Sequence, residues 1–264
     1  MIVGISLLSL ITIVYLGICV SFYFFQDNFL FKRTQFPLDY KFHYEFPFEE
    51  LFWKTNDGNS INGLWFKQTN PKGVILFFHG NSGHMGRSGN YYKRVRDKNF
   101  DVVLYDYRGY GKSTGKPSMK NLYTDALLVF DWVKKQYPDK PIVLHGLSLG
   151  SHIASFVASH YDVELLILET PFCDLPQVAQ HQYPYLPVKL LMKYNLKTSR
   201  FLPQIKAQIH IFHGTRDRVV PLSEPLKIAK LSGASITIID GANHKNLHDF
   251  LEYNIALEQL LKNV

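Results

Sequence analysis

Short apolar runs alternate with amphipathic stretches along most of the chain. Six of these runs are apolar at nearly every position, which is typical of strands covered on both faces in a parallel sheet. Two more runs flank Asn56-Asp57-Gly58-Asn59, a hairpin signal. The eight predicted strands are residues 50–54, 61–67, 73–78, 102–105, 141–145, 164–168, 208–212 and 235–239.

Helical periodicity fills the spaces between these strands. In residues 119–136 the apolar side chains recur every three or four positions and share one face. The same pattern returns in a last helix near the C-terminus, at residues 255–261. Eight strands joined by helical crossovers predict one doubly wound α/β domain, with a mostly parallel sheet and helices on both faces.

The first 26 residues carry no charged side chain, and residues 2–25 are nearly continuously apolar. Twenty such residues in a helix already cross the roughly 30 Å hydrocarbon layer of a bilayer. A cleaved signal peptide is the alternative, but no basic residue precedes the run and its end, residues 22–25, is bulky. We therefore predict a single-pass membrane protein, with residues 1–27 as its anchor and residues 2–25 in contact with lipid.

The segments that follow the anchor divide the remaining chain. Lys32, Arg33 and Lys41 follow the span, and by the positive-inside tendency they leave the large domain in the cytoplasm. We predict a linker at residues 28–43 and one domain at residues 44–264. Within it, about residues 171–205 lack strands and are rich in proline and aromatic residues, which indicates a lid or a disordered insert. Its apolar content favours an ordered cap that covers a hydrophobic surface or ligand.

Composition narrows the range of partners. The 264 residues carry a formal net charge of +7, which favours anionic surroundings such as acidic lipid head groups. No run of Lys and Arg reaches five, so we predict no nucleic-acid partner. The two cysteines cannot form a disulfide framework or a four-thiolate zinc site. The sequence leaves the oligomeric state open.

The segment Gly146-Leu147-Ser148-Leu149-Gly150 follows a predicted strand and precedes a helical run. This is the G-x-S-x-G pattern in its required setting, where small residues two before and two after the serine allow a sharp turn that exposes the hydroxyl group. A serine that merely caps the helix is the alternative. We predict that Ser148 is a nucleophile at the edge of the sheet.

A serine nucleophile needs a base and a carboxylate that orients the base. Asp217 lies just after one late strand and His244 just after the last strand, so the order along the chain is serine, acid, histidine. We predict these two residues as the partners of Ser148. Glu169 and Asp174 are the alternative acids.

Two backbone N–H groups are expected to stabilise the oxyanion of the reaction intermediate. We assign one to Leu149, directly after the nucleophile, and the other to Asn81 in the loop after the strand at residues 73–78. We expect His79 in that loop to be structural.

Other motifs lack a residue that their chemistry requires. Residues 108–113 resemble the end of a phosphate-binding loop, but Asp106 stands where that loop needs glycine. His244 and His248 are four residues apart, but Lys245 stands where a zinc protease needs glutamate. We predict no metal and no cofactor.

The chain resembles the α/β-hydrolase superfamily over nearly all of residues 44–262. More narrowly, it is similar to the membrane-anchored group typified by the fission-yeast bud-emergence suppressor homologue and its animal relatives. The segments that carry the resemblance are HGN at 79–81, YDYRGYGKSTG at 105–115, HGLSLGS at 145–151, ETPFCDL at 169–175, YPYLPVKLLMKYNL at 183–196, HGTRDRVVP at 213–221 and DGANH at 240–244. The resemblance implies an α/β-hydrolase fold and a catalytic triad at the positions of Ser148, Asp217 and His244.

We therefore expect a membrane-anchored serine hydrolase that cleaves carboxylic esters or thioesters of acyl chains through an acyl-enzyme on Ser148. Its substrate would be a small molecule, a lipid or an acylated protein. Three alternatives remain: an acyltransferase or a serine peptidase with the same triad, and a non-catalytic membrane scaffold that keeps the fold.

Overall fold

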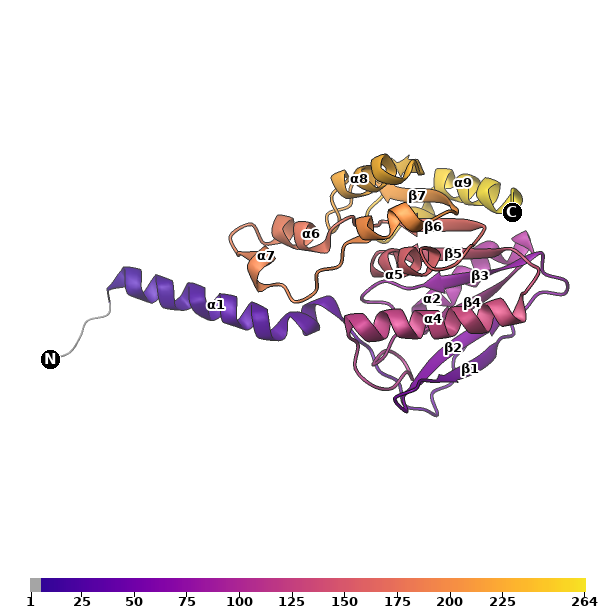
Figure 1. Ribbon diagram of the computed structural model, residues 1–264, viewed down its shortest axis with the longest axis horizontal. Helices are drawn as coiled ribbons and strands as arrows, with labels where there is room; N and C mark the ends of the chain where they lie inside the picture. The colour runs from indigo at the N-terminus through magenta and orange to yellow at the C-terminus, as the bar shows by residue number, and fades with distance from the viewer. Residues whose placement is uncertain (1–5) are drawn as a thin grey trace.

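Eight strands form one mixed sheet in the computed structural model, which describes residues 6–264 (Figure 1). The strands are β1 (Glu49–Lys54), β2 (Ser60–Phe66), β3 (Gly73–Phe78), β4 (Phe100–Tyr105), β5 (Ile142–Leu147), β6 (Leu165–Glu169), β7 (Gln208–Gly214) and β8 (Ser235–Ile239). Their order is β1-β2-β4-β3-β5-β6-β7-β8. β2 is antiparallel to β1 and to β4, and all other pairs are parallel. The predicted fold class is confirmed.

Helices connect these strands and cover both faces of the sheet. The helices are α1 (Leu7–Leu30), α2 (Met85–Ser88), α3 (Asn90–Val95), α4 (Met119–Gln136), α5 (Leu149–Ala158), α6 (Leu175–Gln182), α7 (Val188–Leu191), α8 (Ser223–Ser232) and α9 (Leu251–Lys262). Short 3₁₀ helices occupy residues 96–98, 198–200, 202–204 and 247–249. α4 has the predicted bounds, and it begins there because the hydroxyl oxygen of Ser118 accepts a hydrogen bond from the Asn121 N–H at 3.1 Å.

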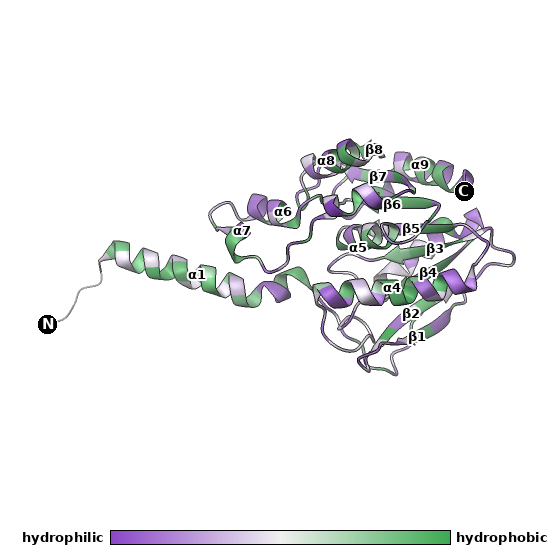
Figure 2. Cartoon of the chain, viewed as in Figure 1, coloured by the Kyte–Doolittle hydropathy of each residue, from purple (hydrophilic) through white to green (hydrophobic). Residues whose placement is uncertain are grey.

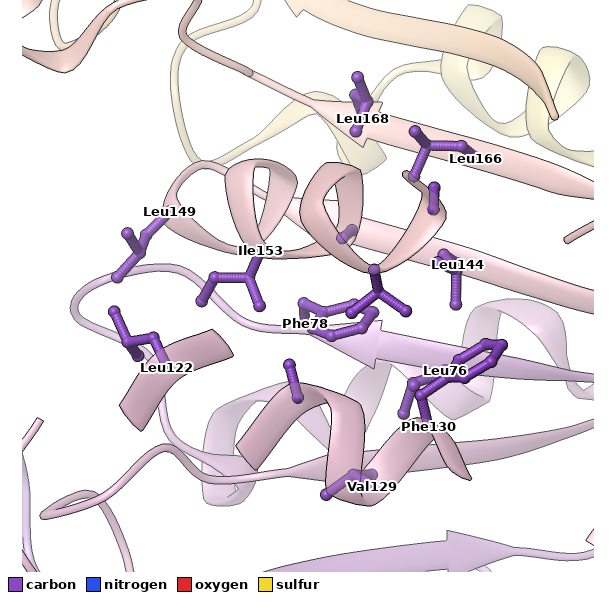
Figure 3. Packing of buried hydrophobic residues seen from close by; sticks show 14 of the residues in the cluster. Leu76, Phe78, Leu122, Val129, Phe130, Leu144, Leu149, Ile153, Leu166 and Leu168 are labelled. Carbon is purple, nitrogen blue, oxygen red and sulfur yellow. The ribbon is translucent and has the colours of Figure 1, made fainter. Parts of the chain in front are cut away.

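The hydrophobic core lies on both sides of the sheet. On one side, strand residues such as Phe78 and Leu144 pack against α4 and α5, which contribute Phe130 and Ile153 (Figure 3). On the other side, α3 and α9 cover the sheet with buried aromatic and aliphatic side chains. Because β3, β5, β6, β7 and β8 run parallel, their carboxyl ends meet at one edge of the sheet, where α/β folds hold their sites.

α1 projects away from this sheet and is apolar along most of its length (Figures 1 and 2). It is long and apolar enough to cross a membrane, and only Cys19 and Gln26 are buried in it. The predicted anchor begins at residue 1, and residues 1–5 lie outside the described part of the chain. α1 ends three residues after the predicted anchor, and the next residues pack on the domain: Phe31 is buried, and the Phe36 N–H donates to the Gly111 carbonyl at 2.8 Å.

Residues 171–205, the predicted cap, form α6, α7 and two 3₁₀ turns between β6 and β7. α6 begins at Leu175 because the Asp174 carboxylate accepts a hydrogen bond from the Gln177 N–H. Buried side chains, among them Phe172 and Leu196, join the segment to the core on the α4 and α5 side. Its outer part lies beside the C-terminal half of α1 (Figure 1).

Candidate active site

Ser148 stands in a strained turn between the end of β5 and the start of α5. Its backbone has φ +53° and ψ −111°, a conformation that residues other than glycine rarely adopt. The neighbouring glycines make the turn possible. A Cβ atom on Gly146 would lie 2.4 Å from the Gly150 carbonyl oxygen, and one on Gly150 would lie 2.0 Å from the Phe78 carbonyl oxygen. Strain of this kind concentrates at functional sites, where the surrounding structure maintains it.

His244 connects Ser148 to Asp217. Its Nε2 lies 3.1 Å from the Ser148 hydroxyl oxygen, and its Nδ1 lies 2.7 Å from Asp217 Oδ2. Asp217 comes from the loop after β7 and His244 from the loop after β8, so parallel strands bring both loops to the edge that carries Ser148. The three residues selected from their order in the sequence thus form one chain of hydrogen bonds.

The Asp217 carboxylate is held by three donors. Its side chain is 0% exposed, and its Oδ1 accepts hydrogen bonds from the N–H groups of Val219 (2.8 Å) and Val220 (2.9 Å). Burial acts to raise the pKa of Asp217, but the hydrogen bond and charge of His244, with the two backbone donors, hold that pKa below its usual value. Asp217 is therefore ionised beside the His244 ring.

The alternative acids have other partners. Asp174 caps α6, and Glu169 lies 2.8 Å from His145 Nε2. In the part of the chain that the structure describes, Asp217 is the carboxylate paired with His244.

The loop after β3 presents Asn81 beside the turn at Ser148. The Asn81 carbonyl accepts hydrogen bonds from the Tyr110 hydroxyl (2.7 Å) and the Lys32 N–H (3.1 Å), which fixes the orientation of the loop. Within residues 6–264, the N–H groups of Asn81 and Leu149 have no acceptor, and Leu149 is the first residue of α5, where helical N–H groups lack one. Sequence reasoning selected both donors but not Tyr110, which lies in the Tyr-rich segment 105–115.

A cavity of about 340 Å³ opens next to Ser148 and His244. This volume is at the small end of the range for ligand pockets. Its apolar wall consists of Phe77, Tyr91, Leu147 and Leu247, and its polar side chains include Arg94, Glu169, Lys245 and His248. No residue of the cap, 171–205, lines it.

Two cations of the cavity, Arg94 and Lys245, form no ion pair among the described residues. Arg94 lies near enough to Glu169 to act on its carboxylate through its charge, but the Glu169 carboxylate is hydrogen-bonded to His145 instead. Burial, followed by the positive charge of Arg94, lowers the pKa of His248, so that ring is neutral. Glu169 is engaged by His145 and by the Tyr253 hydroxyl. An anionic group in the cavity would meet two cations that form no ion pair, although the positive charge of Arg94 also acts on Glu169, whose pKa it helps to lower.

The other basic motif of the sequence is fully paired. Arg108, in the segment that resembles a phosphate-binding loop, bonds the Asp125 carboxylate at 2.7 and 2.9 Å and also pairs with Asp57. Lys112 pairs with Glu50 at 2.7 Å. Across residues 6–264, no three His, Cys, Asp or Glu side chains gather in an arrangement that could hold a metal ion.

Known proteins share this sequence pattern. A family model described as serine aminopeptidase, S33, matches residues 69–198. The alpha/beta hydrolase domain-containing protein 17C of Xenopus tropicalis is 30% identical over 224 residues, which cover 80% of this chain and 69% of that protein. The lysophosphatidylserine lipase ABHD12 of Gallus gallus is 31% identical over 216 residues, which cover 71% of this chain and 55% of that protein.

Solved structures share the fold. The esterase Pf2001 of Pyrococcus furiosus superposes with a TM-score of 0.68 at 20% sequence identity, covering 83% of this chain and 93% of the esterase. A second crystal form of that esterase gives a TM-score of 0.72 at 17% identity, covering 88% and 96%. The sheet order, the serine turn and these similarities lead to one conclusion: the chain belongs to the α/β-hydrolase superfamily and is a hydrolase.

Proposed function

We propose that the protein is a membrane-anchored serine hydrolase that cleaves carboxylic esters or thioesters of acyl chains. The observation that carries the proposal is the hydrogen-bonded chain from Ser148 through His244 to Asp217, built on a strained serine turn beside a cavity. α1 is the proposed anchor, because it is apolar, exposed and long enough to span a bilayer.

Each residue has a chemical role in this proposal. His244 Nε2 accepts the proton of the Ser148 hydroxyl as its oxygen attacks the acyl carbonyl carbon. The negative charge that develops on the carbonyl oxygen accepts hydrogen bonds from the Leu149 and Asn81 N–H groups. Asp217 keeps the proton of the imidazole on Nδ1 and stabilises the imidazolium that forms.

The intermediate then collapses. The carbon–oxygen or carbon–sulfur bond to the leaving group breaks, His244 donates its proton to that group, and the acyl chain stays on Ser148. A water molecule repeats the sequence: His244 takes its proton, the oxygen attacks the acyl carbon, and Ser148 leaves with the proton from His244. The products are a carboxylic acid and an alcohol or thiol.

The charge of the cavity supports an ester whose leaving part carries an anionic group. Arginine forms bidentate hydrogen bonds with phosphate and carboxylate groups. Among the described residues, neither Arg94 nor Lys245 forms an ion pair, although the charge of Arg94 also acts on Glu169. One relative is named as a lipase of lysophosphatidylserine, an anionic acyl ester. We therefore propose that anionic acyl esters are preferred over neutral ones.

The same charge argues against an aminopeptidase, although the matching family model carries that description. An aminopeptidase binds the ammonium group of a peptide, which needs a free carboxylate in the site. Glu169 already accepts from His145 and Tyr253, and the remaining charged side chains in the cavity are cations. These cations would repel an ammonium group.

Labelling with a fluorophosphonate probe tests the proposed nucleophile. We expect the full chain in detergent to be labelled and Ser148→Ala to lose the label completely. Ser159→Ala, at the other end of α5, is the matched control and should label like the natural chain. Persistent labelling of Ser148→Ala would reject this site, and a folded natural chain without labelling or ester hydrolysis would favour the scaffold alternative.

A further inference from the structure

The outer part of the cap, residues 183–192, lies along the middle and C-terminal part of α1; we call it the cap tip (Figure 1). The Tyr15 hydroxyl donates to the Tyr185 carbonyl at 3.0 Å. The rings of Phe22 and Tyr183 meet edge to face with centroids 5.8 Å apart. The cap tip therefore follows α1 from near Gln26 back to Tyr15, into the stretch that is proposed to cross the membrane.

Polar contacts mark the level at which α1 leaves the lipid. Gln26 Nε2 donates a hydrogen bond to the Leu191 carbonyl at 3.1 Å, and Gln26 Oε1 accepts one from the Lys193 N–H at 2.7 Å. One residue further, the Tyr194 hydroxyl donates to the Asp27 carboxylate at 2.8 Å. Charged and amide groups of this kind, with aromatic residues at 22–25, are typical of the membrane–water interface.

The position of Tyr15 gives the depth that the cap tip reaches. Gln26 comes eleven positions after Tyr15, which is about 16 Å of helix. The interfacial layer takes up roughly 6 Å of that length, so Tyr15 lies about 10 Å inside the hydrocarbon layer. Helices that lie in a membrane surface are buried to a similar depth.

The surface of the cap tip is apolar. Tyr185 is 89% exposed and Leu190 is 82% exposed. Its only charged side chain is Lys189, whose long stem allows the ammonium group to reach the head groups. Large apolar side chains in water are unfavourable, whereas against lipid they face a similar environment.

Most of the backbone carbonyls at the start of the cap tip are satisfied. Gln180 Nε2 donates to three carbonyls, those of Tyr183, Pro184 and Leu186, at 3.3, 3.2 and 2.9 Å. The other two carbonyls of residues 183–187 are also satisfied: that of Tyr185 by the Tyr15 hydroxyl and that of Pro187 by the Leu190 N–H. The two prolines have no N–H to satisfy, and among the described residues the N–H groups of Tyr185 and Lys189 have no acceptor. A loop in water has no need of this arrangement, but in hydrocarbon each unsatisfied group costs several kcal/mol.

We propose that the cap tip, residues 183–192, is embedded in the membrane leaflet next to the domain, alongside α1. This inference rests on the proposed membrane anchoring of α1. The proposed active site is connected to the same surface, because the Lys32 N–H after α1 donates to Asn81 and Gln182 donates to the Arg218 carbonyl beside Asp217. The cap tip and α1 together hold the Ser148 edge of the sheet against the leaflet that supplies acyl chains.

Fluorescence from single labelled cysteines tests this placement in the full chain. Cys19 and Cys173 are replaced by serine, and one cysteine is introduced at a time, labelled with the environment-sensitive dye NBD and reconstituted in phosphatidylcholine–phosphatidylserine vesicles. The test variant is Leu190→Cys, with Tyr185→Cys as a second site in the cap tip. Leu231→Cys, an exposed leucine of α8, is the control in water, and Leu16→Cys, an exposed leucine of α1, is the control in lipid.

We expect the dye at positions 190 and 185 to show blue-shifted emission and quenching by lipids with doxyl groups on their acyl chains, as at position 16. The dye at position 231 should show neither effect. If position 16 is quenched and positions 190 and 185 behave like 231, the cap tip lies in water or against a protein partner, and the inference is wrong while the anchor stands. If position 16 is not quenched either, the anchor and the inference both fail. Fluorophosphonate labelling of the same variants reports the Ser148 site separately.

Discussion

Two histidine–carboxylate pairs lie at the same edge of the sheet, and they differ in their surroundings. In the open pair, His244 Nδ1 lies 2.7 Å from Asp217. In the sealed pair, His145 Nε2 lies 2.8 Å from Glu169. The carboxylate in each pair has a pKa below its usual value, because hydrogen bonds and opposite charge outweigh its burial. The pairs are therefore close chemical equivalents.

The second nitrogen of each imidazole makes the difference. His244 Nε2 faces the Ser148 hydroxyl at 3.1 Å beside a cavity, and its side chain is 13% exposed. His145 Nδ1 faces the Tyr91 hydroxyl at 2.6 Å, and its side chain is 0% exposed. A histidine–carboxylate pair can serve proton transfer only where its other nitrogen reaches a reacting group. We interpret the sealed pair as structural.

The sealed pair nevertheless supports the site through the backbone. The Glu169 carbonyl accepts hydrogen bonds from the Ser148 N–H at 2.9 Å and from the Ser151 hydroxyl at 3.0 Å. The end of β6 thus holds the strained turn that carries Ser148. Fixing the Glu169 side chain with His145 and Tyr253 keeps that strand end in place.

The largest expected effect separates the two histidines. His244→Ala should lower kcat/KM for a soluble ester by about 10⁴-fold or more, because it removes the proposed base of the triad. His145→Gln should retain kcat/KM within about threefold but lower the free energy of unfolding by about 1–3 kcal/mol, because it disturbs a buried hydrogen-bond network. Ester hydrolysis and chemical unfolding in detergent measure the two quantities. A folded His145→Gln variant that is as inactive as His244→Ala would contradict the interpretation that His145 is structural and only His244 is the base.

Much of the fold followed from the sequence because strong local signals coincide with the tertiary contacts. All eight strands were predicted, and α4 has its predicted bounds because an apolar face and a capping serine agree there. The hydrogen-bonded serine, acid and histidine were selected from the G-x-S-x-G turn, from their positions after strand ends and from their order, since parallel strands bring their carboxyl ends to one edge.

The remaining features depend on contacts between distant segments. Nothing in the local pattern shows that Gln180 satisfies the carbonyls of the cap tip or that Arg94 enters the cavity. Glu169 was considered as a catalytic acid because it follows a strand, but its pairing with His145 involves a neighbouring strand. Hydrophobic periodicity does not reveal a buried ionic pair, because it records the average polarity of a face.

A substitution of Arg94 tests whether this residue binds substrate beside the open pair or supports Glu169 of the sealed pair. If it binds the anionic part of a substrate, Arg94→Gln should raise KM about tenfold for an acyl ester of glycerol phosphate, because a charge-assisted hydrogen bond contributes about 1.5–3 kcal/mol. It should leave KM unchanged for the neutral acyl glycerol of the same chain length. Lys93→Gln, whose exposed side chain pairs with Glu45, is the control on the same helix. Equal effects on both esters, with lower stability, would assign Arg94 to Glu169 instead.

The smallest expected effect is on the pH dependence of stability. Each paired carboxylate has a folded-state pKa below its unfolded value, which is about 4.3 for Glu and 3.9 for Asp. Its contribution to the free energy of unfolding is therefore present at neutral pH and is lost as the pH falls below these values, because the unfolded chain binds a proton first.

Glu169→Gln should lower the free energy of unfolding most near pH 7, and its difference from the natural chain should shrink by up to about 1.4 kcal/mol per pH unit below about pH 4. Asp217→Asn should show the same sign, since both pairs depend on an ionised carboxylate. Chemical unfolding in detergent from pH 3 to pH 7 measures the difference; a difference that stays constant would mean that Glu169 acts by packing rather than by charge, and the two pairs would no longer be chemical equivalents.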